Sequence, residues 1–310
     1  MRIVFFGSPT SALPSLKKLR EAGHSIELVI TQPDKPVGRG KKVSPPPIKK
    51  LALDMNIPIY QSEKIRKDTG ALEKIEKIQP DLNVVVAYGQ IIPSSIIYVP
   101  KYNSVNVHFS FLPKYRGASP VQWAILNGET KTGITIFELN EKMDEGDILT
   151  QEEFEILPHE DAAELETRLA QKGAELLIDT IAKIDEIAPR KQDHSIATYA
   201  PLIKKEDGRI AWTKDALYIE RQVRSFTPWP SAYAFLGEKR VKIHNGRKTE
   251  SKIESSSHGE ILGIKKEGIE VCCGEGSVFL IESLQPENRK KMDAYVFSLG
   301  AKIKPGDKFG

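Results

Sequence analysis

Cysteine, metal-binding motifs and long apolar runs are scarce in this sequence of 310 residues. The two cysteines, Cys272 and Cys273, are adjacent, so they cannot frame a disulfide network, and no CxxC pair is present to hold zinc. No apolar run approaches the ~20 residues that span a bilayer. The opening MRIVFFG is too short an apolar stretch for a signal peptide, and we interpret it as a buried strand. We therefore expect a cytoplasmic protein without a structural metal.

A complete G-x-G-x-x-G fingerprint is also absent, although the chain opens as a strand, a turn at Gly7, a helix and a second strand. Residues 2–6 and 25–31 are the expected strands, and the helix between them ends at Gly23. Short turns between alternating strands and helices are typical of a parallel α/β sheet. The apolar run LNVVVAYG after Asp81 fits a strand that is covered on both faces. The first part of the chain is thus predicted to be α/β, with a Rossmann-like, mostly parallel sheet.

The second part of the chain has a different pattern. A polar segment with two prolines, residues 189–203, is the expected linker between a first domain of residues 1–188 and a second of residues 204–310. After a helix near residues 215–226, short alternating segments separated by Gly and Asn predict about five strands. Short strands of this number favour a small OB-like β-barrel, a fold that often binds nucleic acids.

Basic side chains are unevenly distributed along a chain whose net charge is only +3. Residues 204–310 carry 20 Lys and Arg against 15 Asp and Glu, whereas residues 1–203 carry 25 against 27. Within the first part, a segment rich in Pro and Gly over residues 31–50 has six basic residues and Asp34 as its single acidic one. We expect this segment to be an irregular loop, because its prolines and glycines oppose regular structure. Basic patches favour a polyanionic partner, although lysine-rich surfaces also serve solubility alone.

Three polar residues form the candidate catalytic group: Asn106, His108 and Asp144. Asn106 and His108 are two residues apart on an expected strand over residues 104–109, so both point to one face. Ligands bind open α/β sheets near strand ends, and Asp144 follows a later strand. An amide and an imidazolium can donate to a developing oxyanion, and a carboxylate can orient the histidine. Without a Ser or Cys nucleophile in the group, this set suits direct acyl transfer to an amine. Each residue alone would more often be structural.

The segments NVHFSFLPKYRGASPVQWAILNGE and TGITIFELNEKMDEGDIL resemble the core signature of the folate-dependent formyltransferases. Further segments resemble members of that family that formylate initiator methionyl-tRNA, and together they extend the resemblance over essentially the whole chain: TQPDKPVGRGKKVSPPPIKKLA, VVVAYGQIIP, TYAPLIKKEDGRIAW, FTPWPSAY and IKPGDKFG. The resemblance implies a formyl transferase that uses 10-formyltetrahydrofolate as donor and the amine of initiator methionyl-tRNA as acceptor. It also implies a monomer.

The same resemblance assigns roles to particular positions. The family's catalytic Asn, His and Asp fall on Asn106, His108 and Asp144. The folate-contacting loop falls on a stretch whose Leu112–Pro113 bond is implied to be cis: Ser110, Phe111, Leu112 and Pro113. For the tRNA we expect contacts from the basic segment and from the second domain: Arg39, Lys41, Lys42, Arg209, Arg240 and Lys242. Phe109 and Phe111 stand where many relatives have smaller residues, and both can reshape the folate pocket.

Three other readings remain open at the level of sequence. A formyltransferase for a small amine, such as glycinamide ribonucleotide or an amino sugar, would share the three candidate catalytic residues but would not need the basic segments. A nicotinamide-dependent oxidoreductase would need the missing glycines and an acidic residue where Thr31 stands. An RNA-binding module with a purely structural α/β half would leave the grouping of Asn106, His108 and Asp144 unexplained.

Overall fold

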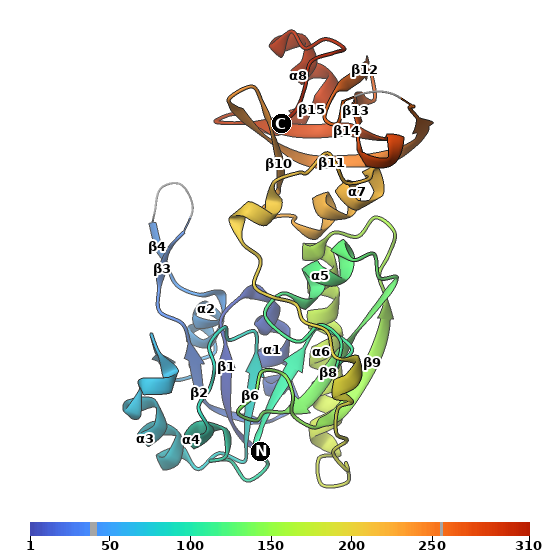
Figure 1. The fold of residues 1–310 in the computed structure, drawn as a ribbon. Helices are drawn as coiled ribbons and strands as arrows, with labels where there is room; N and C mark the ends of the chain where they lie inside the picture. Colours follow the sequence, from blue (N-terminus) through green and yellow to red (C-terminus); the bar gives the residue numbers. More distant parts are fainter. Residues whose placement is uncertain (38–41, 255–256) are drawn as a thin grey trace. The chain divides into compact units, whose positions relative to one another are not determined.

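The structure is a computed structural model that describes residues 1–37, 42–254 and 257–310, with the backbone alone at Val37 and Lys42. The chain divides into two compact units, each with a sheet of its own. The first unit contains residues 1–120, 131–155 and 166–201, and the second contains residues 121–130, 156–165 and 202–310. Figure 1 shows the order of the elements along the chain.

A seven-stranded sheet forms the centre of the first unit, in the order β5-β2-β1-β6-β7-β8-β9. Its first five members in this order are parallel, and β8 and β9 are antiparallel to their neighbours. The strands are β1 Arg2–Gly7, β2 Ser25–Thr31, β5 Ile59–Gln61, β6 Leu82–Val86, β7 Ser104–His108, β8 Lys131–Glu138 and β9 Ile148–Glu155. The predicted Rossmann-like, mostly parallel sheet is therefore confirmed.

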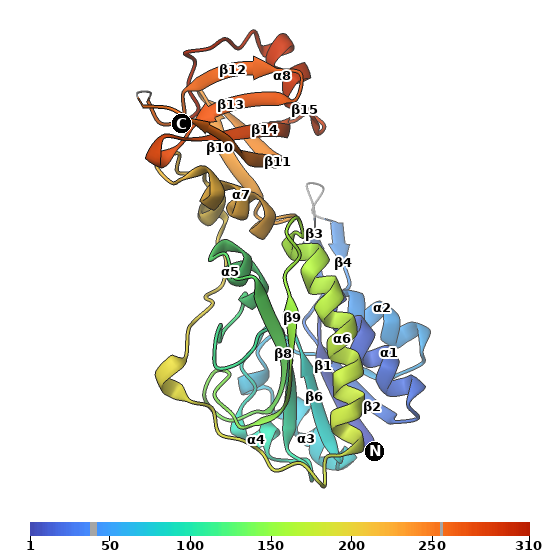
Figure 2. The same ribbon diagram turned by 90° about the vertical axis from the view of Figure 1, so that its right-hand side faces the viewer.

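Helices cover both faces of this sheet, as Figure 2 shows from the side. One face carries α1 Leu13–Glu21, α2 Pro47–Asp54 and α6 Ala162–Ala182, and the other carries α3 Thr69–Ile78 and α4 Ser94–Ile97. Short 3-10 helices lie at Thr10–Ala12, Ile65–Lys67 and His194–Ile196. Gly173 of α6 lies so close to the sheet that an added Cβ would be 2.9 Å from Val107. Every residue of β6 is buried, including Asn83, as its nearly continuous apolar sequence predicts.

The segment over residues 31–50 contains regular structure, and the expectation of an irregular loop is wrong there. Strands β3 Lys35–Val37 and β4 Lys42–Ser44 pair antiparallel as a two-stranded sheet. Pro36 pairs with Val43 in this ribbon. A proline lacks the N–H that a central strand must donate, but a strand with a free edge tolerates this loss. The ribbon therefore forms although its sequence is rich in residues that oppose strands.

An antiparallel sheet with the order β10-β11-β14-β13-β12 forms the second unit, and β15 pairs with β14. The strands are β10 Ala232–Leu236, β11 Lys239–Lys252, β12 Ile261–Lys265, β13 Gly268–Cys272, β14 Ser277–Pro286 and β15 Met292–Asp293. Residues 308–310 join the two edges, because Phe309 bridges Leu236 of β10 and Lys308 bridges Glu260 just before β12. These bridges close the sheet in the manner of a small barrel, in line with the predicted OB-like fold.

The second unit contains α7 Ala216–Ser225, α8 Ala294–Ala301 and most of α5 Pro120–Leu126, together with short 3-10 helices at Lys205–Gly208 and Gly274–Gly276. Its core is formed by apolar residues from all these strands and from Trp212, Ile219 and Phe309. Leu126 packs with Ile203 and Phe226, which explains why part of a segment expected in the first domain belongs to the second unit. The segment expected as a linker, residues 189–203, belongs to the first unit as far as Pro201.

Candidate active site

His108 ends β7, and the contacts of its ring define which nitrogen can exchange a proton. Its Nε2 lies 2.9 Å from the carbonyl oxygen of Tyr115, and that oxygen can only accept, so Nε2 carries the proton. Nδ1 lies 3.9 Å from Oδ2 of Asp144. The His108 side chain is 8% exposed and that of Asp144 is 13% exposed, so the pair is largely removed from water. In the neutral ring Nδ1 therefore holds the lone pair and faces a carboxylate.

The loop that carries Asp144 has a backbone that few residue types could adopt. Asp144 has a φ of 53°, in the left-handed region, and its Oδ2 accepts a hydrogen bond of 2.7 Å from the N–H of Gly117. Gly146 follows in the same loop, and an added Cβ there would lie 1.7 Å from the carbonyl oxygen of Glu138. Tyr115 also has a positive φ, of 60°, and this turns its carbonyl toward His108. Unusual backbone on both sides of His108 is typical of functional sites.

Asn106 lies two residues before His108 on β7, so its side chain points to the same side of the sheet. Its backbone pairs with Val85 of β6 and Phe137 of β8. The side chain is half-buried, and within the described residues no hydrogen bond engages its amide. The structure thus brings His108 and Asp144 within 3.9 Å and places Asn106 on the same strand face.

The predicted folate loop turns away from the strand directly after His108. The Leu112–Pro113 bond is cis, which confirms that prediction. Ser110 is fully buried, and its hydroxyl donates to the carbonyl of Lys114 at 2.7 Å. The side chain of Leu112 is also buried, with Phe137 and Ile148. Phe111 has the exposed side chain of this segment, at 41%, and its ring lies against Gly133 of β8. The role of these residues in binding folate remains a prediction.

Two buried residues support the Asp144 loop, and neither was predicted. Gln192 donates from Nε2 to the carbonyls of Asp144 and Gly146, both at 2.8 Å. Its Oε1 accepts from Nη2 of Arg116 at 2.8 Å, and Nη1 of Arg116 lies 3.3 Å from Oε1 of Glu145. Arg116 is only 1% exposed, so its charge depends on these partners. The position of Arg116 beside Gly117 in the KYRG sequence was a signal from which its role could have been found. Nothing in the polar segment around Gln192 indicated a contact with the Asp144 loop.

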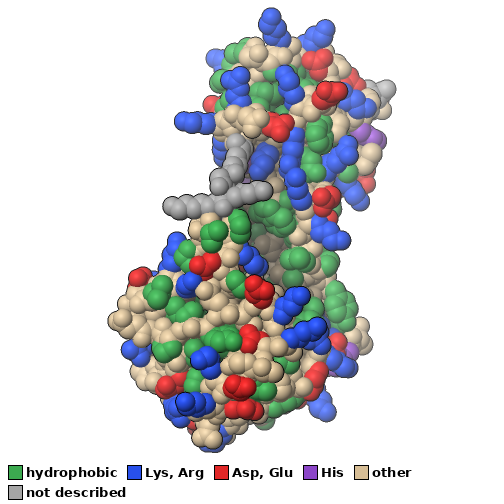
Figure 3. All heavy atoms as spheres, turned by 90° about the vertical axis from the view of Figure 1, so that its left-hand side faces the viewer, with side chains coloured by type: hydrophobic (Ala, Val, Ile, Leu, Met, Phe, Trp, Pro, Cys, Tyr) green, Lys and Arg blue, Asp and Glu red, His purple; other side chains and the backbone are tan. Residues whose placement is uncertain are grey.

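The predicted tRNA contacts fall in two places. Arg39 and Lys41 lie outside the described residues, and Lys42 lies in β4. In the second unit, Arg240 and Lys242 are two residues apart on β11, so their side chains lie on one face of that strand. Arg209 lies beside β10, where its backbone forms a bridge with Tyr233. Figure 3 shows basic side chains spread over the visible face of this unit, with apolar side chains between them.

Neither a metal centre nor a membrane span is formed by residues 1–37, 42–254 and 257–310. Over these ranges no cluster of three or more His, Cys, Asp or Glu side chains is arranged to hold a metal ion. Over the same ranges, none of the helices combines the length and apolar character that crossing a membrane requires.

Comparison with known proteins agrees with this two-part architecture. The formyl transferase family matches residues 1–181, and the C-terminal domain of formyl transferases matches residues 202–302. The chain belongs to the formyl transferase family. The family assignment covers the whole of the candidate site, because Asn106, His108 and Asp144 all lie within the first matched range.

Individual formyl transferases are similar to the chain over nearly its full length. The methionyl-tRNA formyltransferase of Geobacter sulfurreducens is 44% identical over 312 aligned positions, which cover 100% of this chain and 97% of that protein. The crystal structure of WlaRD, a sugar 3N-formyl transferase in the presence of dTDP and 5-N-formyl-THF, is 22% identical with a TM-score of 0.68, covering 94% of this chain and 99% of that one. Methionyl-tRNA formyltransferase from Clostridium thermocellum is 20% identical with a TM-score of 0.58, covering 88% and 100%. The two structures show a shared fold.

Proposed function

We propose that this formyl transferase moves the formyl group of 10-formyltetrahydrofolate to the amino group of initiator methionyl-tRNA. The observation that carries the proposal is the 44% identity with a methionyl-tRNA formyltransferase over 100% of this chain, because it includes both units. A sugar-directed relative shares the fold at 22% identity. We assign the chemistry to the first unit and the binding of the tRNA to the second, with the basic residues of the β3–β4 segment as additional contacts.

The transfer forms a bond between the amine nitrogen and the formyl carbon and breaks the bond from that carbon to the folate nitrogen. One proton leaves the amine, and the folate nitrogen gains one. When bound, 10-formyltetrahydrofolate supplies an activated one-carbon unit, so the protein needs no nucleophile of its own. Near His108, the exposed ring of Phe111 offers an apolar surface that fits a flat pterin.

His108 has the central role in this proposal because of its fixed orientation. Since Nε2–H is held by the Tyr115 carbonyl, Nδ1 is the atom that gives or takes a proton. As an imidazolium, the ring donates from Nδ1 to the formyl oxygen as negative charge develops there, and the amide of Asn106 donates beside it. Asp144, with Oδ2 at 3.9 Å from Nδ1, stabilises the charged ring and helps to take up the amine proton. Holding the two substrates in line contributes the remaining acceleration.

The proposal is tested by incubating the protein with 10-formyltetrahydrofolate and, in parallel, charged initiator tRNA, glycinamide ribonucleotide or an amino sugar nucleotide. Loss of the folate donor is followed in each reaction. We expect consumption that depends on the charged tRNA, and consumption with a small amine alone would contradict the proposal. In the same assay Arg39→Ala should impair formylation of tRNA while folate affinity stays unchanged. Light scattering tests the accompanying expectation of a monomer.

A further inference from the structure

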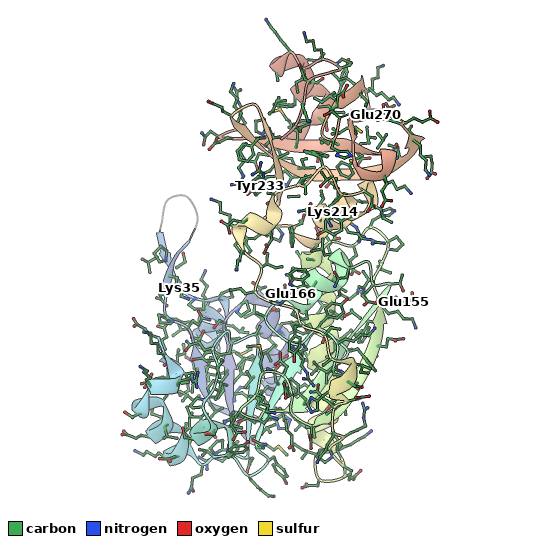
Figure 4. The ribbon with its side chains drawn as sticks, in the orientation of Figure 1. Lys35, Glu155, Glu166, Lys214, Tyr233 and Glu270 are labelled. Carbon is green, nitrogen blue, oxygen red and sulfur yellow. The ribbon has the colours of Figure 1, made fainter. Side chains whose placement is uncertain are left out.

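The outer face of the β10–β11 hairpin combines aromatic rings with cations. Phe235 pairs with Arg240 and Tyr233 pairs with Lys242, and directly opposed residues of an antiparallel pair share one face. The other face of the hairpin contributes Ala232, Ala234, Val241 and Ile243 to the core of the second unit. The aromatic and basic side chains of the hairpin therefore share the face that points away from this core. Figure 4 labels Tyr233 on this hairpin.

Each arginine of this face is positioned by a ring. The guanidinium of Arg240 lies 3.8 Å from the centre of the Tyr233 ring, and that of Arg209 lies 5.6 Å from the centre of the Phe235 ring. The two rings contact each other edge to face at 5.9 Å. In the described part of the chain neither Arg209 nor Arg240 forms an ion pair, so both retain charge that a polyanion can neutralise. Tyr233 itself is only 9% exposed beneath these groups, so it offers no open surface for stacking.

Trp229 lies in the loop that leads into β10, and it is an open aromatic surface beside this face. Its side chain is 57% exposed, which is unusual for a residue with so large an apolar area. Ser231 closes this loop, because its N–H donates to the carbonyl of Phe226 at 2.9 Å and its hydroxyl donates to the carbonyl of Pro228 at 2.9 Å. The buried Pro230 packs near Gly208. Thus the backbone of the loop that carries Trp229 is held in place, while the indole remains largely exposed to water.

The loop is also connected to the basic face. The ammonium of Lys242 donates to Oγ of Ser231 at 3.3 Å, two residues along the chain from Trp229. Gly208 packs closely against the same loop, since an added Cβ at this position would lie 2.4 Å from the carbonyl oxygen of Ser231 and 3.3 Å from the Tyr233 ring. The row of groups therefore runs from Arg240 through Tyr233 and Lys242 to the Trp229 loop. Cations beside a loop that carries an exposed flat ring are the features with which proteins bind unpaired nucleotides.

We propose that Trp229 stacks on an unpaired base of the bound tRNA while Arg209, Arg240 and Lys242 neutralise the phosphates beside it. This inference rests on the proposed function and adds a specific recognition element to it. The charged groups provide attraction without sequence information. The indole selects for a base that is not already stacked within a duplex, because only such a base can lay its face on the ring.

The first test compares Trp229→Ala, Trp229→Phe and the control Leu299→Ala, which removes another exposed apolar side chain, 63% exposed, from the same unit. Loss of one stacked base should raise the KM for charged tRNA about 5- to 140-fold in Trp229→Ala. The kcat at saturating tRNA and the KM for 10-formyltetrahydrofolate should stay unchanged. Trp229→Phe retains a ring and should raise the KM for tRNA by less than Trp229→Ala. An unchanged KM for tRNA in Trp229→Ala would overturn the proposal.

A second test is independent of catalysis, so it separates failure of this inference from failure of the proposed function. The chain has three tryptophans, of which Trp212 is 5% exposed and Trp123 is half-buried. An RNA duplex with a single-stranded 3′ overhang should quench the fluorescence of the intact protein, and Trp229→Phe should lose this quenching. Equal quenching by a blunt duplex or by polyglutamate, or full quenching in Trp229→Phe, would overturn the assignment. Absence of formylation together with overhang-dependent quenching would instead contradict the proposed substrate alone.

Discussion

At the scale of single residues, the candidate site depends on where protons are held. The Tyr115 carbonyl fixes the proton of His108 on Nε2, and the N–H of Gly117 fixes Asp144 through the same oxygen that faces Nδ1. Both contacts use backbone groups, so they do not depend on the rotamer of a neighbouring side chain. Asp144 is thereby held as an acceptor, and a substitution that keeps its shape but removes its charge isolates the electrostatic part of its role.

Replacement of His108 by Ala should lower kcat about 10²- to 10³-fold, since one donor to the developing oxyanion is lost. Asp144→Asn retains an acceptor for Gly117 N–H but loses the charge beside Nδ1, and it should also lower kcat with little change in either KM. The control is Asp185→Asn, because Asp185 is an exposed carboxylate that accepts from the hydroxyl of Tyr102 at 2.8 Å. Steady-state kinetics with both substrates measures these effects. A kcat for Asp144→Asn equal to that of the control would show that the charge of Asp144 has no role in catalysis.

A second residue prediction concerns pH and stability in the second unit. Burial is the largest cause that lowers the pKa of His244 below its ordinary value of 6.5, and the cations Lys291 and Lys242 lower this pKa further. The unfolded chain therefore binds a proton at this residue more tightly than the folded chain does. As pH falls through 6.5 toward the lower pKa of the folded state, His244 should reduce the free energy of unfolding.

Urea unfolding at pH 7.5 and pH 5.5 measures this effect, and tryptophan fluorescence follows it because all three tryptophans lie in the second unit. His244→Gln is neutral at both values of pH, so its free energy of unfolding should fall less between them than that of the unchanged protein. If both proteins lose the same free energy on acidification, His244 does not contribute to the pH dependence.

At the scale of elements, the loop between β8 and β9 decides whether Asp144 reaches His108. Gly146 allows the loop to pass over the end of β8, because an added Cβ would overlap the carbonyl oxygen of Glu138 at 1.7 Å. Gln192 then holds the carbonyls of Asp144 and Gly146 from the other side. The loop is thus positioned by a close backbone approach and by a buried amide, neither of which depends on substrate.

Gly146→Ala should therefore displace Asp144 and lower kcat more than tenfold, because a shift of about 1 Å in a catalytic group costs on the order of 10²-fold in rate. Gly300→Ala is the control, since a Cβ at that helical position meets nothing within 4 Å. Rates of formylation are compared for the two variants after each has been shown to unfold cooperatively. Activity of Gly146→Ala close to that of Gly300→Ala would show that the loop can rearrange without consequence.

The elements that sequence predicts best are those whose pattern is local. The buried strand β6 follows from a nearly continuous apolar run, and the helix α7 follows from Asp215, whose side chain caps the helix. Strand β9 has a mixed burial pattern and was not predicted, because its half-exposed sequence lacks regular alternation. The contacts of Gln192 could not be predicted either, since its partners lie 46 and 48 residues away along the chain. Long-range polar contacts leave no periodic signal.

At the scale of the whole molecule, the residue patterns and the family resemblance predicted the two kinds of sheet and the grouping of His108 with Asp144. They also placed basic side chains in the second unit. The patterns did not reveal that residues 121–130 and 156–165 belong to the second unit, because this grouping arises from side-chain packing. Leu126 packs with Phe226, one hundred residues later, and the hydroxyl of Ser225 donates to the carbonyl of Gln122 at 2.7 Å. The type of the main sheet in each unit was thus predictable, whereas the assignment of residues 121–130 and 156–165 to the second unit was not.

Assignment of chemistry to one unit and of RNA binding to the other makes the two substrates respond differently to salt. Binding of a polyanion releases counterions, so the logarithm of the KM for charged tRNA should rise linearly with the logarithm of salt concentration. The KM for 10-formyltetrahydrofolate should change far less. Arg240→Ala should remove one of the proposed phosphate contacts, so it should raise the KM for tRNA and reduce the salt slope by about 1.

Arg247→Ala is the matched control for this measurement. Arg247 lies on the same strand, β11, but its guanidinium is already paired with Glu282 at 3.0 Å, so it has less charge to offer a phosphate. The slope should therefore stay unchanged in Arg247→Ala and decrease in Arg240→Ala, while the KM for folate remains the same in both. If both variants keep the slope of the unchanged protein, the hairpin face does not contact the RNA backbone. If Arg240→Ala lowers folate affinity as well, the effect of Arg240 is not specific to the RNA.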